Sequence, residues 1–389
     1  MVIISLGVIA RSDQLFSAHQ ERFMESLTSC KPMINRYLIT KTCWIIVLLI
    51  QAFSSLTMAQ DEFVKKPDSL ETGGIPQIPI SLAKAVTPYT TVYGLSLAGW
   101  DPEKREILVK QYTSSSVWIH RISSPGDRQK VWKYIKADGI YDVYMSSKSL
   151  NIIYNKDVGG NEQYQMFLYE TGDNKSKLIS DIESSNTEFV WSNSGDRVVY
   201  CRSKSSEGPG VSLYIVSPSD PNSNKPLIKS QGNYIKAYDW SPDDKMVVFC
   251  EFISQNVCRL WLLNIDTGQK TLLSSPRKSA IEYFRTPQFS KDGKGIYVVT
   301  DFNSKVRYLA YLDLATKKYT RISKNTQWEI DNFKLSPDGK TIAVTCNEEG
   351  VSKLYVYDIS TQLESQVKSI PFGVISDLTW HKNSLDLAF

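Results

Sequence analysis

The apolar residues of this chain fall into short runs that are separated by polar turns, and they do not form the longer stripes of amphipathic helices. Several of these runs are apolar at almost every position. They are Leu213-Tyr214-Ile215-Val216, Leu260-Trp261-Leu262-Leu263, Tyr308-Leu309-Ala310-Tyr311-Leu312 and Leu354-Tyr355-Val356-Tyr357. A strand is apolar on both faces when its sheet is packed between two other sheets. The pattern therefore predicts short, doubly covered β-strands.

A repeated phrase precedes these runs: an aromatic or apolar residue, usually Ser, a short turn, a charged residue and another strand. The clear copies are Trp191-Ser192-Asn193-Ser194-Gly195-Asp196, Trp240-Ser241-Pro242-Asp243-Asp244-Lys245, Phe289-Ser290-Lys291-Asp292-Gly293-Lys294, Leu335-Ser336-Pro337-Asp338-Gly339-Lys340 and Trp380-His381-Lys382-Asn383-Ser384. Two degenerate copies, which match only part of the phrase, are Trp100-Asp101-Pro102 and Met145-Ser146-Ser147. Ser-Pro-Asp-Gly suits a type I turn, because Pro presets φ at its second position and Gly fits its fourth. The phrase predicts a tight turn between the first two strands of each unit.

The first residues of these copies, which we call the anchors, recur every 45 to 49 residues. A fourth strand such as Lys270-Thr271-Leu272-Leu273 follows the apolar run of each unit. Four strands in about 45 residues are typical of a β-propeller blade. A β-sandwich is the alternative, but it does not require so regular a period. We expect an all-β chain whose residues 90–389 form six near-complete propeller blades and a truncated seventh.

The C-terminal stretch LTWHKNSLDLAF contains the seventh copy of the phrase. Leu385 to Phe389 is the strand that follows its turn. In the other units two more strands come after this one, and the chain ends before them. We therefore expect the chain to be part of a larger protein.

The N-terminal residues have the pattern of a secretory signal peptide. Basic residues precede the apolar run 44–50, and the small residues of Thr57-Met58-Ala59 follow it. We expect residues 1–59 to be a signal peptide that is cleaved after Ala59, in which residues 1–32 are an over-extended gene start and Met33 begins a compact signal peptide. We expect the mature protein to be periplasmic or secreted. A membrane anchor is the alternative, although the run is short for a span. Residues 60–89 then form an N-terminal arm.

Composition adds few constraints. The 389 residues are 42% apolar, 22% charged and 11% aromatic, and the formal charge of +4 is scattered, which argues against nucleic-acid binding. The mature chain holds four cysteines, of which Cys250 and Cys258 flank a predicted hairpin loop. They could form a disulfide or remain buried free thiols. Without a Cys-x-x-Cys pair, and with Asp residues dispersed one to a blade, we expect no metal site and no cofactor.

Longer stretches of the chain resemble the propeller of prolyl oligopeptidase-family serine peptidases of the dipeptidyl- and acylaminoacyl-peptidase type, and the shorter phrases resemble TolB-like repeats. The stretches are Ile75 to Pro79, Pro88-Tyr89, Asp157 to Gln165, Asp239 to Asp243, Leu309 to Thr316, Leu335 to Gly339, Cys346 to Gly350 and Leu378 to His381. They run from about residue 75 to the end. The resemblance implies that an α/β-hydrolase domain with a Ser-Asp-His triad follows the propeller, and that the propeller restricts entry to short or unfolded peptides.

The catalytic residues of that family do not carry over to this chain. The nucleophile elbow requires Gly-x-Ser-x-Gly. Gly-x-Ser occurs at residues 94–96, 210–212 and 350–352, but the fifth positions are Ala98, Tyr214 and Leu354. The histidines are His19 in the leader, His120 on a strand and His381 in the seventh turn. We expect no catalytic residues and no activity from this chain alone, although the family implies a hydrolase.

Two functional hypotheses remain open. The first is a propeller that gates or docks peptide substrates for a missing hydrolase domain. The second is a stand-alone, TolB-like periplasmic propeller that binds a protein or peptide partner. The loop Asp157 to Glu162, with two carboxylates and paired glycines, is expected to be a tight hairpin, and a substrate-facing role is the alternative.

Overall fold

The computed structural model describes residues 2–4, 62–90, 94–113, 116–124, 129–130, 135–136, 140–146, 148–170, 172, 175–275, 281–324 and 327–389. The chain forms two compact units, one of Met1–Gly7 with Tyr93–Phe389 and one of Val8–Val92. No helix in the described part of the chain is long and apolar enough to cross a membrane. The predicted signal peptide lies outside the described residues, except for the strand Val2–Ile4.

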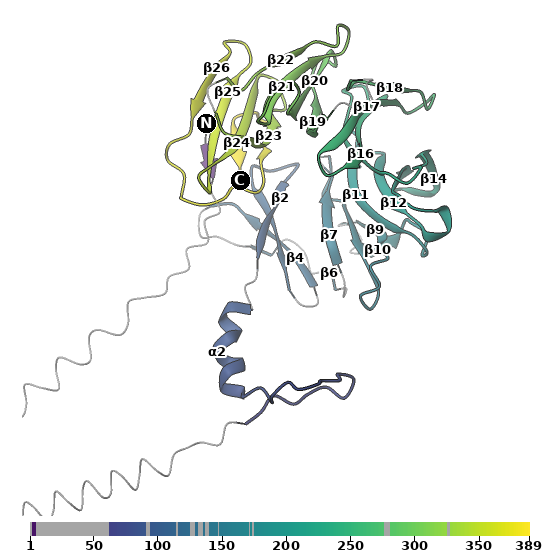
Figure 1. Ribbon diagram of the computed structural model, residues 1–389, viewed down its shortest axis with the longest axis vertical. Helices are drawn as coiled ribbons and strands as arrows, with labels where there is room; N and C mark the ends of the chain where they lie inside the picture. Colours follow the sequence, from purple (N-terminus) through teal and green to yellow (C-terminus); the bar gives the residue numbers. More distant parts are fainter. Residues whose placement is uncertain are drawn as a thin grey trace, which may run out of the picture. The chain divides into compact units, whose positions relative to one another are not determined.

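The larger unit is a ring of six antiparallel sheets, which we number as blades 1 to 6 in chain order (Figure 1). Blade 1 consists of β2 (Leu95–Trp100), β3 (Ile107–Tyr112), β4 (Ser116–Ile122), β5 (Gln129–Lys130) and β6 (Ile135–Lys136), the last two both pairing with β4. Blade 2 consists of β7 (Ile140–Met145), β8 (Ile152–Lys156), β9 (Gln165–Glu170) and β10 (Lys175–Leu178). Blade 3 consists of β11 (Ser185–Trp191), β12 (Val198–Ser203), β13 (Ser212–Ser217) and β14 (Asp220–Ile228), with a 3₁₀ turn at Ser205–Glu207.

The next three blades repeat the four-stranded order of blades 2 and 3. Blade 4 consists of β15 (Tyr234–Trp240), β16 (Met246–Ser254), β17 (Val257–Asn264) and β18 (Lys270–Leu272). Blade 5 consists of β19 (Phe284–Phe289), β20 (Gly295–Thr300), β21 (Tyr308–Asp313) and β22 (Tyr319–Arg321). Blade 6 consists of β23 (Ile330–Leu335), β24 (Thr341–Glu348), β25 (Val351–Asp358) and β26 (Leu363–Gln366). The predicted propeller of six blades is thereby confirmed.

A small seventh sheet lies between blade 6 and blade 1. It consists of β27 (Thr379–Trp380), β28 (Asp386–Ala388) and β1 (Val2–Ile4), and β1 pairs with β28 in parallel. It corresponds to the predicted incomplete seventh blade. The pairing of β1 was not foreseen, because residues 1–59 were expected to be a leader rather than part of a sheet.

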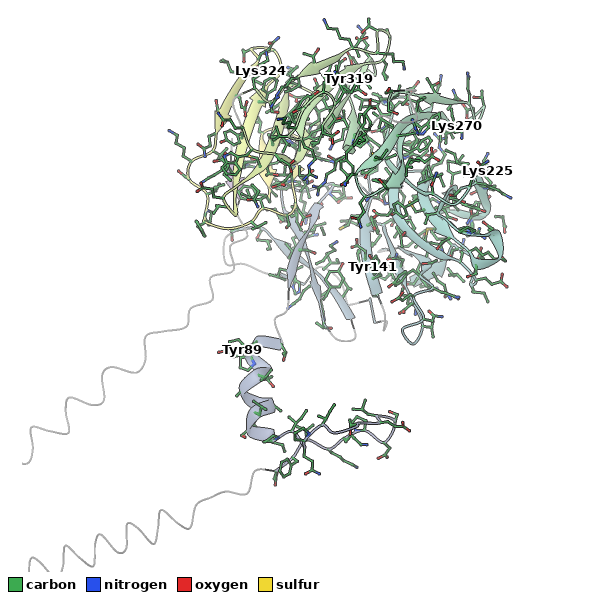
Figure 2. All side chains as sticks on the ribbon, viewed as in Figure 1. Tyr89, Tyr141, Lys225, Lys270, Tyr319 and Lys324 are labelled. Carbon is green, nitrogen blue, oxygen red and sulfur yellow. The ribbon has the colours of Figure 1, made fainter. Side chains whose placement is uncertain are left out.

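The apolar side chains fill the spaces between neighbouring sheets. Seven clusters of buried residues are each shared by two sheets that follow one another around the ring, and the last two join the seventh sheet to blades 6 and 1. Figure 2 shows the side chains between the sheets. Lys225 and Lys270 belong to the outermost strands β14 and β18, and the figure shows them at the outer margin of the ring. Burial of apolar area between blades is the main source of stability in such a repeat fold.

Each anchor ends the first strand of its sheet, and the predicted turn follows it. In blade 5 the Gly293 amide donates to the Ser290 carbonyl oxygen at 2.9 Å, which closes the turn. Gly293 has φ +69°, and the same position in blade 6, Gly339, has φ +73°. A type I turn followed by a left-handed residue is a common hairpin connection. Glycine is favoured here because it adopts positive φ without steric cost.

Two copies of the turn place a different residue at the left-handed position. Asp244 has φ +55° and Ser384 has φ +59°. Both side chains accept hydrogen bonds from the turn of the preceding blade: Asp244 from Asn193 and Ser194, and Ser384 Oγ from the Asp338 amide at 3.0 Å. At these two positions the side chain that replaces glycine accepts a hydrogen bond from the neighbouring blade.

Tryptophan anchors connect sheets in a second way. The Trp240 indole donates to the Val190 carbonyl oxygen at 3.1 Å, and the Trp380 indole donates to the Lys334 carbonyl oxygen at 2.9 Å. The Trp100 indole of blade 1 donates to the Thr379 carbonyl oxygen of β27 at 3.0 Å. The seventh sheet is therefore bonded to both of its neighbours, and the ring is closed.

An ion pair reinforces this closing contact. Arg105 donates to both carboxylate oxygens of Asp386, with Nη2 to Oδ1 at 2.6 Å. The Asp386 side chain is only 2% exposed, whereas that of Arg105 is 58% exposed. The Arg105 hydrogen bond is the main reason that the pKa of Asp386 lies below its usual value.

The smaller unit contains the predicted arm. Phe63 and Pro79 form an isolated antiparallel bridge, and α2 (Ile80–Thr90) follows it. None of the helix residues is buried, and Pro88 lies inside the helix. The helix was not predicted, because residues 60–89 were expected to be an N-terminal arm without an assigned secondary structure.

Candidate functional site

The first strands of the blades surround the axis of the ring, and a cavity of about 350 Å³ lies between them. Its wall comes from β2, β15, β19 and β23 and from the segment that leads into β27. Apolar wall residues include Leu97, Pro287 and Phe333, and charged wall residues include Asp239 and Lys334. We call this cavity the axial pocket. A volume of this size is at the lower end of that of small-molecule sites.

The residue directly before each anchor lies at the axial pocket in blades 4, 5 and 6. In blade 4, Asp239 Oδ2 accepts a hydrogen bond from the amide of the next anchor, Phe289, at 2.8 Å. In blade 5, Gln288 Oε1 accepts from the amide of the next anchor, Leu335, at 3.3 Å. These two side chains therefore fasten each blade to the one that follows it.

Lys334 occupies the same position in blade 6, and it cannot form this bond. A lysine ammonium group donates hydrogen bonds but accepts none. Lys334 is also not part of any of the ion pairs formed among the described residues. Its side chain is accessible to water, yet it lies inside a pocket whose walls come from several blades. Lys334 is thus free to interact with a ligand.

The electrostatics around Asp239 and Lys334 follow from desolvation by the pocket walls and from the charge of the nearby Lys291. Although Lys334 keeps contact with water, the pocket walls partly desolvate it and lower its pKa, opposed by the attraction of Asp239, and the positive charge of Lys291 lowers the pKa further. Burial raises the pKa of Asp239, opposed mainly by Lys334 and by the hydrogen bond from Phe289. Asp377 also lines the pocket, so the charged side chains of its wall are two carboxylates and one lysine, Lys334.

The histidines identified in the sequence lie far apart along the chain. His120 is on β4, where its Nε2 atom lies 3.0 Å from Gln111 Oε1 on β3. His381 is buried in the seventh turn, its ring packed edge-on against Trp100 at 4.9 Å between centroids, and its Nδ1 atom accepts from the Asn383 amide. His19 lies outside the described residues.

The Gly-x-Ser serines are parts of blade strands. Ser96 is on β2, Ser212 begins β13 and Ser352 is on β25. Ser212 Oγ accepts from the Ser230 amide at 3.0 Å, and Ser352 Oγ accepts from the Ile375 amide at 3.0 Å. These two hydroxyl groups therefore have structural partners. The expectation that no catalytic residue is present stays a prediction.

The loop Asp157 to Glu162 connects β8 to β9 in blade 2, as expected for a hairpin. Asp157 Oδ2 accepts from the Glu162 amide at 3.1 Å, and Gly159 and Gly160 have φ +66° and +77°. The carboxylate of Asp157 thus closes its own loop.

The pair Cys250 and Cys258 is reduced in the structure. Both thiols are buried, and both donate to the Phe284 carbonyl oxygen, at 3.8 Å and 3.4 Å respectively. Cys250 lies opposite Leu260 rather than Cys258, so the two cysteines are diagonal neighbours in the β16–β17 ladder. Of the two readings of the sequence, the structure has the buried free thiols. Among the described residues, no group of three His, Cys, Asp or Glu side chains lies close enough to hold a metal ion.

Comparison with known proteins finds a family and several relatives that match parts of this chain. Residues 197–384 match the family described as the dipeptidyl peptidase IV (DPP IV) N-terminal region. Dipeptidyl-peptidase 5 of Porphyromonas gingivalis is 24% identical over 139 residues, which cover 33% of this chain and 20% of that protein. The uncharacterized protein YdjN of Bacillus subtilis strain 168 is 26% identical over 122 residues, covering 27% of this chain and 35% of that protein.

Among solved structures, a prolyl endopeptidase superposes with a TM-score of 0.62 at 10% identity, covering 88% of this chain and 50% of that one. At this identity the similarity concerns the fold alone. The chain spans between a fifth and about a third of the length of the two curated relatives, and half of the prolyl endopeptidase chain.

Proposed function

Because residues 197–384 match the N-terminal region of the dipeptidyl peptidase IV family, we propose that this chain is the non-catalytic propeller portion of an exported prolyl oligopeptidase-family serine peptidase. In this role it gates or docks peptides for an α/β-hydrolase domain. The family match is the observation that carries the proposal. The similarity to Dipeptidyl-peptidase 5 supports the choice of peptides as substrates.

The axial pocket is consistent with peptide docking. It combines apolar wall residues with a few polar and charged groups, the usual composition of a site that orients a small ligand. Its volume of about 350 Å³ favours a short peptide and excludes a folded domain.

The decisive experiment is to read the coding sequence downstream of Phe389 in all frames. We expect further strands and then a Gly-x-Ser-x-Gly elbow, which exposes the nucleophile of an α/β-hydrolase. Stop codons in every frame without such a continuation would overturn the proposal and favour a stand-alone propeller.

A biochemical test uses the purified chain. We expect no labelling by a fluorophosphonate and no cleavage of chromogenic aminoacyl or prolyl dipeptides, because the chain has no elbow motif. Covalent labelling of this chain would contradict the proposal. For export, we expect secretion to leave Gln60 as the first residue, which N-terminal sequencing of the exported protein checks.

A further inference from the structure

A second cavity lies between blades 5 and 6. Its wall comes mainly from the turns that follow the Phe289 and Leu335 anchors, from β20, β21 and β22 of blade 5, and from the end of β25 of blade 6. We call it the interblade pocket. Its volume of about 500 Å³ lies within the range of about 300–1,000 Å³ that is typical of small-molecule sites. None of the wall residues that the structure describes is shared with the axial pocket.

Blade 5 departs from the repeat at three positions in or beside the wall of this pocket. Tyr297 pairs with the residue before its anchor, and the other five blades have an apolar residue at this position: Leu108, Ile153, Val199, Val248 and Ala343. Tyr311 pairs with Tyr297 on the next strand, and the two ring centroids are 5.0 Å apart. Gly295 leaves room for the Tyr311 ring, because a Cβ atom at this position would overlap it. The sixth residue after the anchor is glycine in blade 5 alone.

Two tyrosines of the wall are almost completely buried, yet the protein does not use their hydroxyl groups. Tyr297 is 6% exposed and Tyr357 is 4% exposed, and both belong to the apolar cluster between blades 5 and 6. Neither hydroxyl has a hydrogen-bond partner among the described residues. Burial raises the pKa of Tyr297 to about 12 and also raises that of Tyr357, so both hydroxyls stay protonated at neutral pH. Each can therefore donate one hydrogen bond and accept another at the pocket.

The charges around the pocket disfavour an ionic ligand of either sign. The wall contains three cations and two carboxylates: Lys291, Arg321, Lys324, Asp292 and Asp338. In addition to burial, nearby carboxylates raise the pKa of the three wall tyrosines: Asp292 at Tyr297 and Tyr311, Asp313 at Tyr311, and Asp358 and Glu364 at Tyr357. These carboxylates would repel an anion placed at the tyrosine hydroxyls, whereas the three cations of the wall would repel a cation. A neutral ligand avoids both kinds of repulsion.

The mixture of polar groups in the wall favours a ligand with hydroxyl groups. The lysine and arginine side chains only donate hydrogen bonds, the carboxylates only accept them, and Tyr297, Tyr357 and Thr320 do both. A ligand hydroxyl can pair with every one of these groups, because it donates and accepts at the same atom. A peptide carbonyl cannot pair with the carboxylates, and a peptide N–H cannot pair with the ammonium groups. An apolar ligand would leave the whole set unpaired.

We propose that the interblade pocket binds a neutral mono- or disaccharide, with the Tyr297 and Tyr357 hydroxyls as hydrogen-bond partners of its hydroxyl groups. A sugar carries several hydroxyl groups on a compact, uncharged ring, and the tyrosine rings supply apolar contact surface for its carbon frame. This site is independent of the proposed function, which concerns the axial pocket and a following domain.

Saturation-transfer difference NMR with the full chain tests the ligand class. The probes are glucose, galactose, maltose, cellobiose and lactose, each titrated alone. Glucuronic acid and glucosamine are the matched probes that carry a negative and a positive charge at pH 7, and N-acetyl-Pro-Pro-Pro amide represents a neutral peptide. We expect saturable binding of at least one neutral sugar and weaker binding of both charged sugars and of the peptide.

Variants assign the binding to the two hydroxyls. Tyr297→Phe and Tyr357→Phe keep the rings and remove only the hydroxyl groups. Each should weaken sugar binding about fivefold, because a hydrogen bond between neutral groups contributes that much, and the double variant should bind more weakly than either. Tyr355→Phe is the matched control and should bind like the unmodified chain. Tyr355 lies on β25 like Tyr357, but its hydroxyl donates to Glu348 Oε1 at 2.7 Å and it is not among the described wall residues.

Urea denaturation without sugar separates a binding role from a structural one. Tyr297→Phe and Tyr357→Phe should leave the unfolding midpoint unchanged or raise it, because no protein hydrogen bond is lost. Tyr355→Phe should lower the midpoint, because it loses the bond to Glu348.

Several results would overturn the saccharide site. They are the absence of saturable binding by all five neutral sugars, stronger binding of a charged sugar or of the peptide, and undiminished sugar binding by the double variant. A lowered midpoint in Tyr297→Phe or Tyr357→Phe would show that the hydroxyls serve the fold, and the inference would fail. None of these results bears on the proposed function, which the coding sequence downstream of Phe389 decides.

Discussion

Replacement of Asp244 tests how the blades are held together. The Asp244 carboxylate accepts hydrogen bonds from the Asn193 amide at 2.7 Å, the Asn193 side-chain amide at 2.9 Å and the Ser194 amide at 2.8 Å. All three donors come from the turn of blade 3, whereas Asp244 belongs to the turn of blade 4. Because most other clear copies have Gly at this position, Asp244→Gly removes the carboxylate and leaves the backbone unstrained.

The expected loss can be estimated from these contacts. Hydrogen bonds to a charged group contribute about 1.5–3 kcal/mol each when they are buried. Asn193 and Ser194 are exposed, so water can replace the carboxylate at their amides, and the total should stay near the lower limit. We expect Asp244→Gly to lower the free energy of unfolding by about 2 kcal/mol. Asp244→Ala should lower it by about 1 kcal/mol more, because a side chain at φ +55° is strained.

Urea denaturation followed by circular dichroism measures these differences. The control is Asp266→Ala in the exposed β17–β18 turn, which should change stability by less than about 0.5 kcal/mol. The pH dependence adds a second check. Burial would raise the pKa of Asp244, but the hydrogen bonds from Asn193 and Ser194 outweigh it, and the net effect lowers the pKa.

The sign of the pH effect follows from this lowered pKa. The stabilising contribution of Asp244 is fully present above the unfolded-state pKa of about 3.9 and is lost as the pH falls through the folded-state pKa. The difference between the unmodified chain and Asp244→Gly should therefore be constant from pH 5 to 8 and shrink below about pH 4. Equal stability of the two proteins at pH 7, or Asp244→Ala being more stable than Asp244→Gly, would refute this reasoning.

Three further predictions concern other contacts in the ring. Gly295→Ala places a Cβ atom against the Tyr311 ring, so we expect it to lower the free energy of unfolding, measured by urea denaturation, by about 1–3 kcal/mol. The decrease should be smaller in a Tyr311→Ala background, and an equal decrease in both backgrounds would exclude the clash. Trp240→Phe should lower the free energy of unfolding by about 1–3 kcal/mol in the same assay, because it leaves the Val190 carbonyl oxygen of blade 3 without its indole donor. Unchanged stability would show that this hydrogen bond does not hold the blades together. Arg105→Met should lower the thermal midpoint at pH 7, because it breaks the ion pair with Asp386. The pKa of Asp386 is lowered, so this decrease should shrink as the pH falls below about 4 and vanish below the folded-state pKa; a decrease that does not shrink with falling pH would contradict the ion pair.

The sequence predicts the number and the order of the blades because both depend on local patterns. The anchors, the Ser-Pro-Asp-Gly turns and the doubly apolar strands repeat within each unit, so a single chain contains several copies of the same evidence. Local signals also predicted the hairpin around Asp157. The strand partner of β28 could not be predicted, because its pairing joins residues from opposite ends of the chain.

The side chains that connect blades are harder to recognise, because each acts on a residue about 50 positions away. Asp244 and Ser384 differ from the other copies only by occupying a glycine position, and the sequence contains no sign of their hydrogen-bond donors. The structure was needed to show that Lys334 occupies the same position in blade 6 as Asp239 and Gln288 do in blades 4 and 5. Alignment of the clear repeats on their anchors would have singled out Asp244 and Ser384, but not Lys334, because the residue before the anchor differs in every copy.

The bonds made by the tryptophan anchors also bear on how such a ring can change during evolution. Each indole donates to a main-chain oxygen of the neighbouring sheet, and Asp239 and Gln288 likewise accept from main-chain amides. The main chain offers these groups whatever the sequence. A blade duplicated by unequal recombination would therefore find its bonding partners in any neighbour, without a compensating mutation there.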